Sequence, residues 1–160
     1  MDINITETLL FSTKEYFVEF FDINSDNIKD RIVVRNNLAF AFPTILPIVP
    51  GHILVCPIRA VQSCENLTKD EWDAILALKS IVCAALIKAF EVESFNFAWN
   101  NGENAGQTVP HFHLHIVPRK KGDTGILKYD PRVFLYRPGS RAVSPEQEIL
   151  EISALLRSHL

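Results

Sequence analysis

Cysteine is scarce in this chain, and the few cysteines present form no recognisable pattern. The 160 residues contain three of them, Cys56, Cys64 and Cys83, which is an odd number with no Cys-x-x-Cys pair. An odd count without that spacing argues against a disulfide framework. Two of the three lie in apolar segments, so we expect reduced, buried thiols and a cytoplasmic protein.

Long apolar runs, internal repeats and an excess of basic charge are also missing. No segment approaches the roughly 20 apolar residues of a membrane span, and the first residues do not resemble a signal peptide, so we expect no membrane association. The net charge of −3 disfavours a general nucleic-acid binder. An ordinary composition, 48% hydrophobic and 22% charged, predicts one soluble globular domain with its own core.

The most informative stretch is His111-Phe112-His113-Leu114-His115, which is followed by Ile116-Val117-Pro118-Arg119. Alternate side chains of a β-strand share a face, so all three imidazoles are expected on one side of the strand. Phe112, Leu114 and Ile116 would then point into a core. This pattern predicts a functional role for the histidine side.

Geometry limits which role the histidines can have. Neighbours two residues apart are separated by about 6.6 Å along a strand, so His111 and His115 would stand roughly 13 Å apart. One zinc ion, with bonds of about 2.0–2.1 Å, could bind two neighbours, and a third ligand would have to come from His52 or His159. A reactive His113 that its two neighbours orient or supply with protons suits the row better. A pure metal site and three purely structural histidines are the alternatives.

Upstream of the histidines, the sequence predicts three short strands. Two are expected at 31–35 and 38–42, joined by an Asn-Asn turn, because asparagine tolerates left-handed backbone conformations. Pro50-Gly51 suits a type II turn and leads into a third strand at 52–56. His52 opens that strand at a point from which its side chain can reach a site, although a lone histidine there is more often a surface or structural residue.

Two helices and a further strand are also predicted. Thr68-Lys69-Asp70-Glu71 is a capping box that begins a helix ending near residue 90. Its apolar stripe, expected in the core, comprises positions 72, 75, 76, 82, 83, 86 and 90. A strand with an aromatic face is expected at 94–100. Ser144-Pro145-Glu146-Gln147 predicts a second helix with proline at its first position. The apolar side of that helix comprises Ile149, Ile152, Leu155 and Leu156.

A loop with two glycines, residues 100–108, leads directly into the histidine stretch. Glycine lets the backbone approach a ligand closely, and successive amides in such a loop can form an anion-binding nest. Asn100, Gln107 and Thr108 add neutral donors. An ordinary hairpin loop would look similar, but its position before the histidines predicts a phosphate cradle next to a nucleophile.

Two segments of the chain resemble motifs of the histidine triad (HIT) superfamily. Residues 106–119 resemble its signature, and residues 50–57 resemble its upstream motif. Their order, the capped helix between them and Asn100-Asn101-Gly102 match as well, so the resemblance covers about residues 30–122. It implies an α+β fold, with a five-stranded antiparallel sheet, one long helix at about 68–90 and a C-terminal helix. Members of the superfamily usually dimerise into a ten-stranded sheet.

The resemblance also implies nucleotide hydrolysis or nucleotidyl transfer at an α-phosphate. A neutral imidazole attacks phosphorus and forms a covalent nucleotidyl-histidine, which water then hydrolyses. His113 matches the nucleophile and His115 matches the residue near the leaving group, while His111 and His52 match the supporting network. The positions that bind substrate in the family are matched by Asn100, Gly106, Gln107, Thr108 and Thr44. Thr44 stands where the family commonly has Asp or Asn, which bind the ribose hydroxyls of the nucleotide. The Thr44 hydroxyl can form a hydrogen bond, but it cannot act as a bidentate acceptor for the ribose hydroxyls.

Sequence details favour one branch of the superfamily. The segments 116–120 and 54–57 resemble the fragile-histidine-triad type, which cleaves dinucleoside polyphosphates such as diadenosine tri- and tetraphosphate and releases AMP. The nucleoside phosphoramidase type usually ends in Trp-Pro-Pro-Gly, which is absent here. At position 100, however, the asparagine matches the phosphoramidase type, whereas the fragile-histidine-triad type has glutamine. The uridylyltransferase branch is disfavoured, because its motif has glutamine at the position of His115. A phosphoramidase, and a non-catalytic nucleotide- or zinc-binding module, are the remaining alternatives.

These features divide the chain into an N-terminal extension (1–27), a catalytic domain (28–122) and a basic loop with the C-terminal helix (123–160). Residues 119–141 contain seven Lys and Arg against two Asp, a local excess of +5 that could hold a polyphosphate or simply be solvated. The partners expected are a small nucleotide substrate and a second copy of the chain, with no nucleic acid. We expect no covalently bound cofactor and no metal-ligating residues, with Mg²⁺ as a candidate companion of the substrate.

Overall fold

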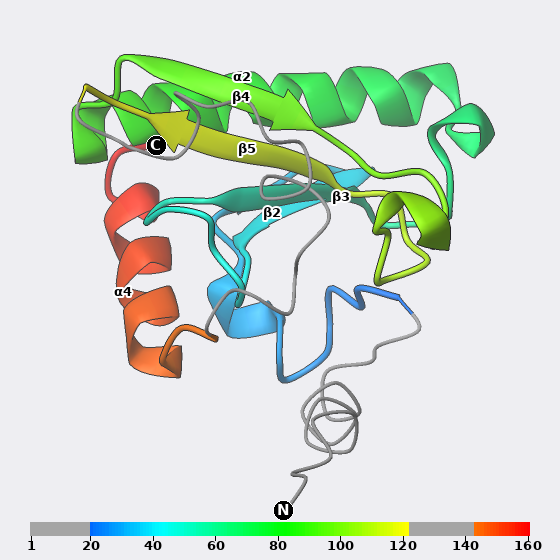
Figure 1. Ribbon diagram of the computed structural model, residues 1–160, viewed down its shortest axis with the longest axis horizontal. Coiled ribbons are helices and arrows are strands. Elements are labelled where there is room, and N and C mark those ends of the chain that lie inside the picture. The colour runs from blue at the N-terminus through cyan, green and yellow to red at the C-terminus, as the bar shows by residue number, and fades with distance from the viewer. Residues whose placement is uncertain (1–19, 122–142) are drawn as a thin grey trace, which may run out of the picture.

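The computed structural model describes residues 20–121 and 143–160. These residues form an antiparallel five-stranded sheet in the order β1-β2-β3-β5-β4, together with two α-helices (Figure 1). The strands are β1 (Val34–Arg35), β2 (Ala39–Pro43), β3 (Ile53–Pro57), β4 (Ser94–Ala98) and β5 (Leu114–Arg119). The helices are α2 (Lys69–Phe90) and α4 (Glu146–Arg157), and the 3-10 turns are η2 (Lys29–Arg31), η3 (Cys64–Asn66) and η4 (Glu103–Ala105). The predicted α+β fold is therefore confirmed.

Helix α2 covers one face of the sheet (Figure 1). The predicted capping box begins it, because the Thr68 hydroxyl accepts from the Glu71 amide and the Glu71 carboxylate accepts from the Thr68 amide. The helix ends at Glu91, whose φ of 52° is left-handed. Ile75 and Val82 of the predicted stripe are fully buried, but Leu76 is 41% exposed. Leu78 and Ala85, which the prediction omitted, are buried in its place.

The opposite face of the sheet carries a second apolar cluster. It is built from Phe40, Phe42, Leu54, Cys56 and Ile28, with Phe21, Ile23 and Ile32 packed against it. Leu54 of β3 pairs in register with His115 of β5, so His115 lies on this second face. Among the described residues, the chain before β1 therefore packs on the side of the sheet where the histidines are.

The hairpin between β1 and β2 forms for a different reason from the predicted one. Neither asparagine of the turn has positive φ, so the expected left-handed conformation was wrong. Instead, the Asn36 side-chain oxygen accepts from the amides of Leu38 and Ala39, at 3.0 and 2.8 Å. This side-chain bond closes the turn, and β1 is only two residues long.

Helix α4 packs against α2, β2 and η2 at one end of the sheet (Figure 1). The predicted capping box at its start was wrong, because Pro145 is the N-cap and no side chain caps the helix. The Ser144 amide instead donates to the carbonyl of Ile45. Ile149 and Leu156 are buried as predicted, whereas Leu155 is 38% exposed.

Several predictions fall on residues outside the described ranges. The first 19 residues of the predicted N-terminal extension and most of the basic segment belong to this group. Arg119, the first member of the basic segment, is described and lies buried in β5, so it is not part of a solvated loop. No helix in the described part of the chain is long and apolar enough to cross a membrane.

Candidate active site

The fold brings four histidines together on the second face of the sheet. His115 lies in β5, His52 precedes β3, and His111 and His113 precede β5. The strand predicted to carry all three alternating histidines was too long, because β5 begins only at Leu114. The Phe112 amide donates to the carbonyl of Val61 and not to a neighbouring strand of the sheet. The predicted alternation of faces still holds. Phe112 packs against Trp72 and Trp99 on the α2 side, while the rings of His113 and His115 lie 4.9 Å apart on the other side.

His52 reaches this cluster through the predicted Pro-Gly turn. The His52 amide donates to the carbonyl of Val49, and Gly51 has a φ of +84°. A Cβ atom on Gly51 would also lie 3.0 Å from a methyl group of Leu86 in α2. Glycine is therefore required both by the backbone conformation and by the close approach of the helix.

His113 is held as a neutral imidazole with one free nitrogen. Its Nδ1 lies 2.7 Å from the backbone oxygen of His111. A carbonyl oxygen can only accept, so Nδ1 carries the hydrogen and Nε2 keeps its lone pair. Burial lowers the pKa of His113 and outweighs the bond to the His111 carbonyl, which raises it. The bond from Nδ1 and the lowered pKa are both consistent with a neutral ring whose lone pair is on Nε2.

His111 is fully buried and uses both of its ring nitrogens within the protein. Its Nδ1 accepts from the Phe21 amide at 3.0 Å, and its Nε2 therefore carries the hydrogen and donates to the Pro57 carbonyl at 2.9 Å. Burial, the largest cause, lowers the pKa of His111 to about 4. His111 is a support for its neighbour and has no nitrogen left for a substrate.

His52 and His115 form a directed pair. The Ile48 amide donates to His52 Nδ1 at 3.1 Å, so the hydrogen of His52 is on Nε2. That Nε2 lies 2.9 Å from His115 Nδ1 and donates to it. The hydrogen of His115 must then be on its own Nε2. The ring centroids of His115 and His113 lie 4.9 Å apart.

The loop before the histidines holds its shape through side-chain bonds. Gln107 is buried, and its amide donates to the Gln62 carbonyl and accepts from the Gly102 amide, both at 2.8 Å. The Asn100 amide donates to the carbonyl of Gly106 at 3.2 Å. Gly102 and Gly106 both have positive φ, which favours glycine. The predicted donor Gln107 therefore braces the loop.

The other predicted substrate contacts differ in their surroundings. Thr108 is exposed at the end of the loop. The Thr44 hydroxyl accepts from the Leu46 amide at 3.2 Å, and the Thr44 amide donates to the His52 carbonyl. Thr44 thus lies next to the histidine pair, but its hydroxyl is part of a local turn.

The sequence prediction missed Phe21. The ring of Phe21 lies 5.4 Å from that of His113, edge to face, and 5.3 Å from that of Phe42. Phe21 belongs to the predicted N-terminal extension (1–27), in which several aromatic residues are close in sequence. The sequence does not show which of these aromatic residues turns towards the histidines.

The family model of the HIT domain matches residues 25–122. The chain belongs to the HIT family. All four histidines of the site lie within the matched part, whereas Phe21 precedes it. The resemblance found in the two sequence motifs is therefore confirmed.

Among curated HIT relatives, a bis(5'-adenosyl)-triphosphatase of Dictyostelium discoideum is 39% identical over 95 residues, which is 59% of this chain and 64% of that protein. An asymmetrical bis(5'-nucleosyl)-tetraphosphatase of Schizosaccharomyces pombe is 37% identical over 110 residues, or 69% of this chain and 58% of that protein. The chain thus spans about three fifths of the length of these relatives. The crystal structure of the Caenorhabditis elegans NitFhit protein superposes with a TM-score of 0.67 at 28% identity, over 82% of this chain and 27% of that one.

Proposed function

We propose that this HIT protein hydrolyses dinucleoside polyphosphates at an α-phosphate and releases AMP. The hydrogen-bond network around His113 carries the proposal, because it leaves a neutral imidazole with its lone pair on Nε2. The names of two curated relatives, a triphosphatase and a tetraphosphatase of dinucleosides, support this substrate class.

The proposed reaction has two displacements at phosphorus. His113 Nε2 forms a bond to the α-phosphorus while the bond to the bridging oxygen breaks, and the nucleoside di- or triphosphate leaves as an anion. His115 Nε2 donates a hydrogen bond to that oxygen as negative charge develops on it. The His111 carbonyl stabilises the positive charge that appears on the His113 ring. Water then attacks the α-phosphorus and loses one proton to solvent, while the bond between phosphorus and His113 Nε2 breaks. AMP leaves, and neutral His113 is restored.

A phosphoramidase with the same nucleophile is the first alternative. Asn100, which matches that branch, lies in the braced loop close to Gly106. A zinc-binding module is the second alternative and has less support. The lone pairs of His111 Nδ1, His52 Nδ1 and His115 Nδ1 all accept hydrogens within the protein. No group of three or more metal-binding side chains occurs among residues 20–121 and 143–160.

The function is tested by product analysis. Diadenosine triphosphate, diadenosine tetraphosphate and an adenosine phosphoramidate are offered side by side at neutral pH, with and without Mg²⁺. We expect AMP with ADP or ATP from the first two substrates, faster than turnover of the third. His113→Ala should abolish turnover while nucleotide binding, measured by calorimetry, persists. His159→Ala, which changes a histidine at the end of α4, is the matched control and should be fully active.

Each other result of this experiment has a definite meaning. Turnover of the phosphoramidate alone would move the protein to the other branch. No AMP from any substrate, together with stoichiometric zinc in the purified protein, would leave the binding module as the better description.

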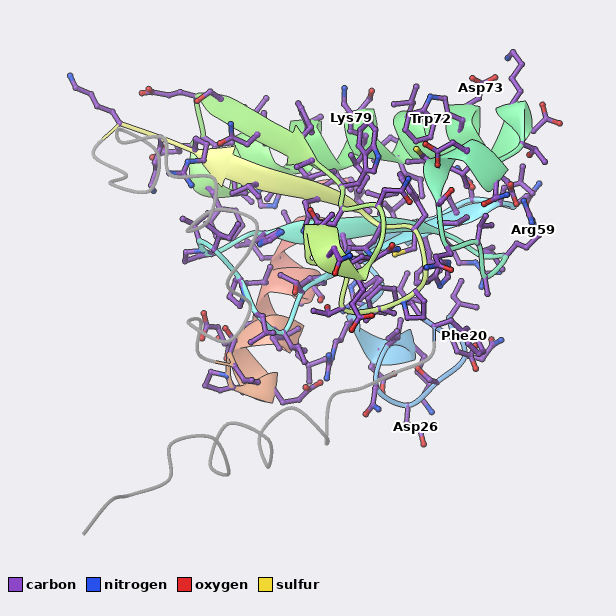
Figure 2. All side chains as sticks on the ribbon, turned by 45° about the vertical axis from the view of Figure 1, so that its right-hand side comes forward. Phe20, Asp26, Arg59, Trp72, Asp73 and Lys79 are labelled. Carbon is purple, nitrogen blue, oxygen red and sulfur yellow. The ribbon has the colours of Figure 1, made fainter. Side chains whose placement is uncertain are left out.

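The surface around β4 supports a homodimer, which we also propose. β4 lies at one edge of the described sheet, and exposed edges invite pairing with another strand. Phe97 and Trp99 at this edge are 45% and 41% exposed, and Leu76 of α2 is 41% exposed. Lys79 lies over the ring of Phe97 on the same side (Figure 2). Pairing of β4 with β4 of a second copy would cover this apolar surface and build a ten-stranded sheet.

The compartment is proposed from the cysteines. All three cysteines are free thiols, and burial raises the pKa of Cys56 well above its ordinary value. Unreactive reduced thiols suit a reducing environment, so we propose a cytoplasmic location.

A further inference from the structure

Phe21 contacts the proposed nucleophile and its support from outside the part of the chain that the HIT family model matches. Its amide donates to His111 Nδ1, and its ring meets the rings of His111, His113 and Phe42. The ring centroids of Phe21 and His113 are 5.4 Å apart and the planes are perpendicular. One residue therefore touches both histidines that precede β5.

The amide of Phe21 determines which nitrogen of His111 carries the hydrogen. An amide can only donate, so it requires the lone pair at Nδ1 and leaves the hydrogen at Nε2 for the Pro57 carbonyl. The His111 ring is thereby held at both ends. The backbone oxygen of the same residue accepts from His113 Nδ1, so the orientation of His113 depends on how firmly His111 is held.

The ring of Phe21 meets the ring of His113 edge to face. Only 7% of His113 is accessible, and Phe21 is one of the residues packed against it. Two titratable groups face His113 within the described residues. His111 is uncharged above its pKa of about 4 and then has no charge that could shift the pKa of His113. His115 is hydrogen-bonded to His52. Burial is the main cause that lowers the pKa of His113, and the Phe21 ring packed against it contributes to that burial.

We propose that Phe21 is a positioning residue of this site, whose amide fixes His111 and whose ring keeps the His113 imidazole turned towards the substrate and shielded from water. This inference rests on the proposed role of His113 as nucleophile. It assigns a catalytic contribution to a segment outside the family motifs.

The kinetic test compares Phe21→Ala with Phe20→Ala. Phe20 is the matched control, because it is the adjacent residue, has the same side chain and lies 44% exposed at the surface (Figure 2). We expect Phe21→Ala to lower kcat about tenfold with KM within twofold, because the reacting nitrogen loses its orientation. Phe21→Tyr should recover most of kcat, and Phe20→Ala should match the wild type.

A second measurement needs no substrate. Nitrogen chemical shifts of the imidazoles report which ring nitrogen carries hydrogen, and their pH titration reports the pKa of each ring. In the wild type we expect His111 with the hydrogen on Nε2, and a pKa of His113 below the ordinary 6.5. Phe21→Ala should raise the pKa of His113 towards the ordinary value, and Phe20→Ala should not.

These readouts separate failure of the inference from failure of the proposed function. An inactive wild type with the expected titrations would overturn the hydrolase alone. A Phe21→Ala variant that only raises KM would make Phe21 a wall of the substrate pocket, and one that only melts earlier would make it structural. Either result, or a hydrogen on His111 Nδ1, would overturn the positioning role.

Discussion

At the scale of single residues, four identical side chains have different roles because their hydrogen-bond partners differ. His111 donates to a carbonyl and accepts from an amide, so it is a rigid support. His113 donates to a carbonyl through Nδ1, so its lone pair is on Nε2, the nitrogen that we propose as the nucleophile. His52 turns its hydrogen towards His115, which leaves the hydrogen of His115 on the far nitrogen. The chemistry of each imidazole follows from the atom that faces its Nδ1.

His111 predicts how the stability of the protein depends on pH. Its folded pKa of about 4 lies below the ordinary 6.5, so between these values the unfolded chain binds more protons than the folded one. The free energy of unfolding should therefore fall as pH decreases from 6.5 to 4, by on the order of 3 kcal/mol. Urea unfolding at several pH values measures this loss.

The matched variant for this prediction is His111→Gln, which keeps a polar side chain but cannot titrate. It should be less stable at pH 7, because it fits the two bonds of His111 less well. Its stability should fall less steeply between pH 6.5 and 4. An identical slope in the variant and the wild type would assign the acid sensitivity to other groups.

At the scale of elements, the start of α2 is tied to the segment that holds His111. The Glu71 carboxylate accepts from Arg59 at 2.8 and 2.7 Å and from the Thr68 amide at 2.8 Å. The bond from Arg59 is the main cause that lowers the pKa of Glu71 to about 2. Arg59 follows Pro57, whose carbonyl receives the hydrogen of His111. The capping box is thus linked through Arg59 to the segment that bonds to His111.

Glu71→Ala should destabilise the protein by about 2 kcal/mol, because it removes a helix cap and leaves the Thr68 amide without its acceptor. Asp73→Ala is the control on the same helix. Asp73 is exposed and pairs only with exposed Lys69, so its loss should change the free energy of unfolding by less than about 0.5 kcal/mol. Figure 2 shows Asp73 and Arg59 at this end of the molecule. Equal effects of the two variants in chemical denaturation would contradict the role of Glu71.

At the scale of the whole molecule, the two edge strands of the described sheet differ in length and in the side chains beside them. The β1 edge is two residues long and offers little backbone for pairing. The β4 edge is five residues long and lies beside exposed aromatic side chains, and a cavity of about 370 Å³ lies beside Trp72 and Trp99. The surface suited to a second copy is therefore on the α2 side, away from the face that carries the histidines.

Phe97→Glu should convert a dimer into a monomer, because it places a charge in the proposed apolar interface. Sedimentation analysis of the wild type and the variant measures the masses directly. Leu155→Glu changes an exposed apolar residue of α4, far along the chain from β4, and should leave the dimer intact. A wild type that sediments as a monomer, or a Phe97→Glu variant that stays dimeric, would rule out this interface.

Several features of the protein follow from the sequence alone because their causes are local. The capping box at Thr68, the Pro50-Gly51 turn and the alternation of His113 with Phe112 and Leu114 each depend on neighbours within a few residues. The family motifs, which place the histidines at the starts of two strands, belong to the same group. The proposed branch of the family also rests on residues next to those motifs.

Other features were decided only by the tertiary structure, because their causes are distant along the chain. The hydrogen on His111 depends on Phe21, 90 residues away, and the bond between His52 and His115 spans 63 residues. Gln107 braces its loop through Gln62, so its buried place could not be read from the loop. A sequence shows which side chains can donate or accept, but the folded backbone selects the atom that each of them faces.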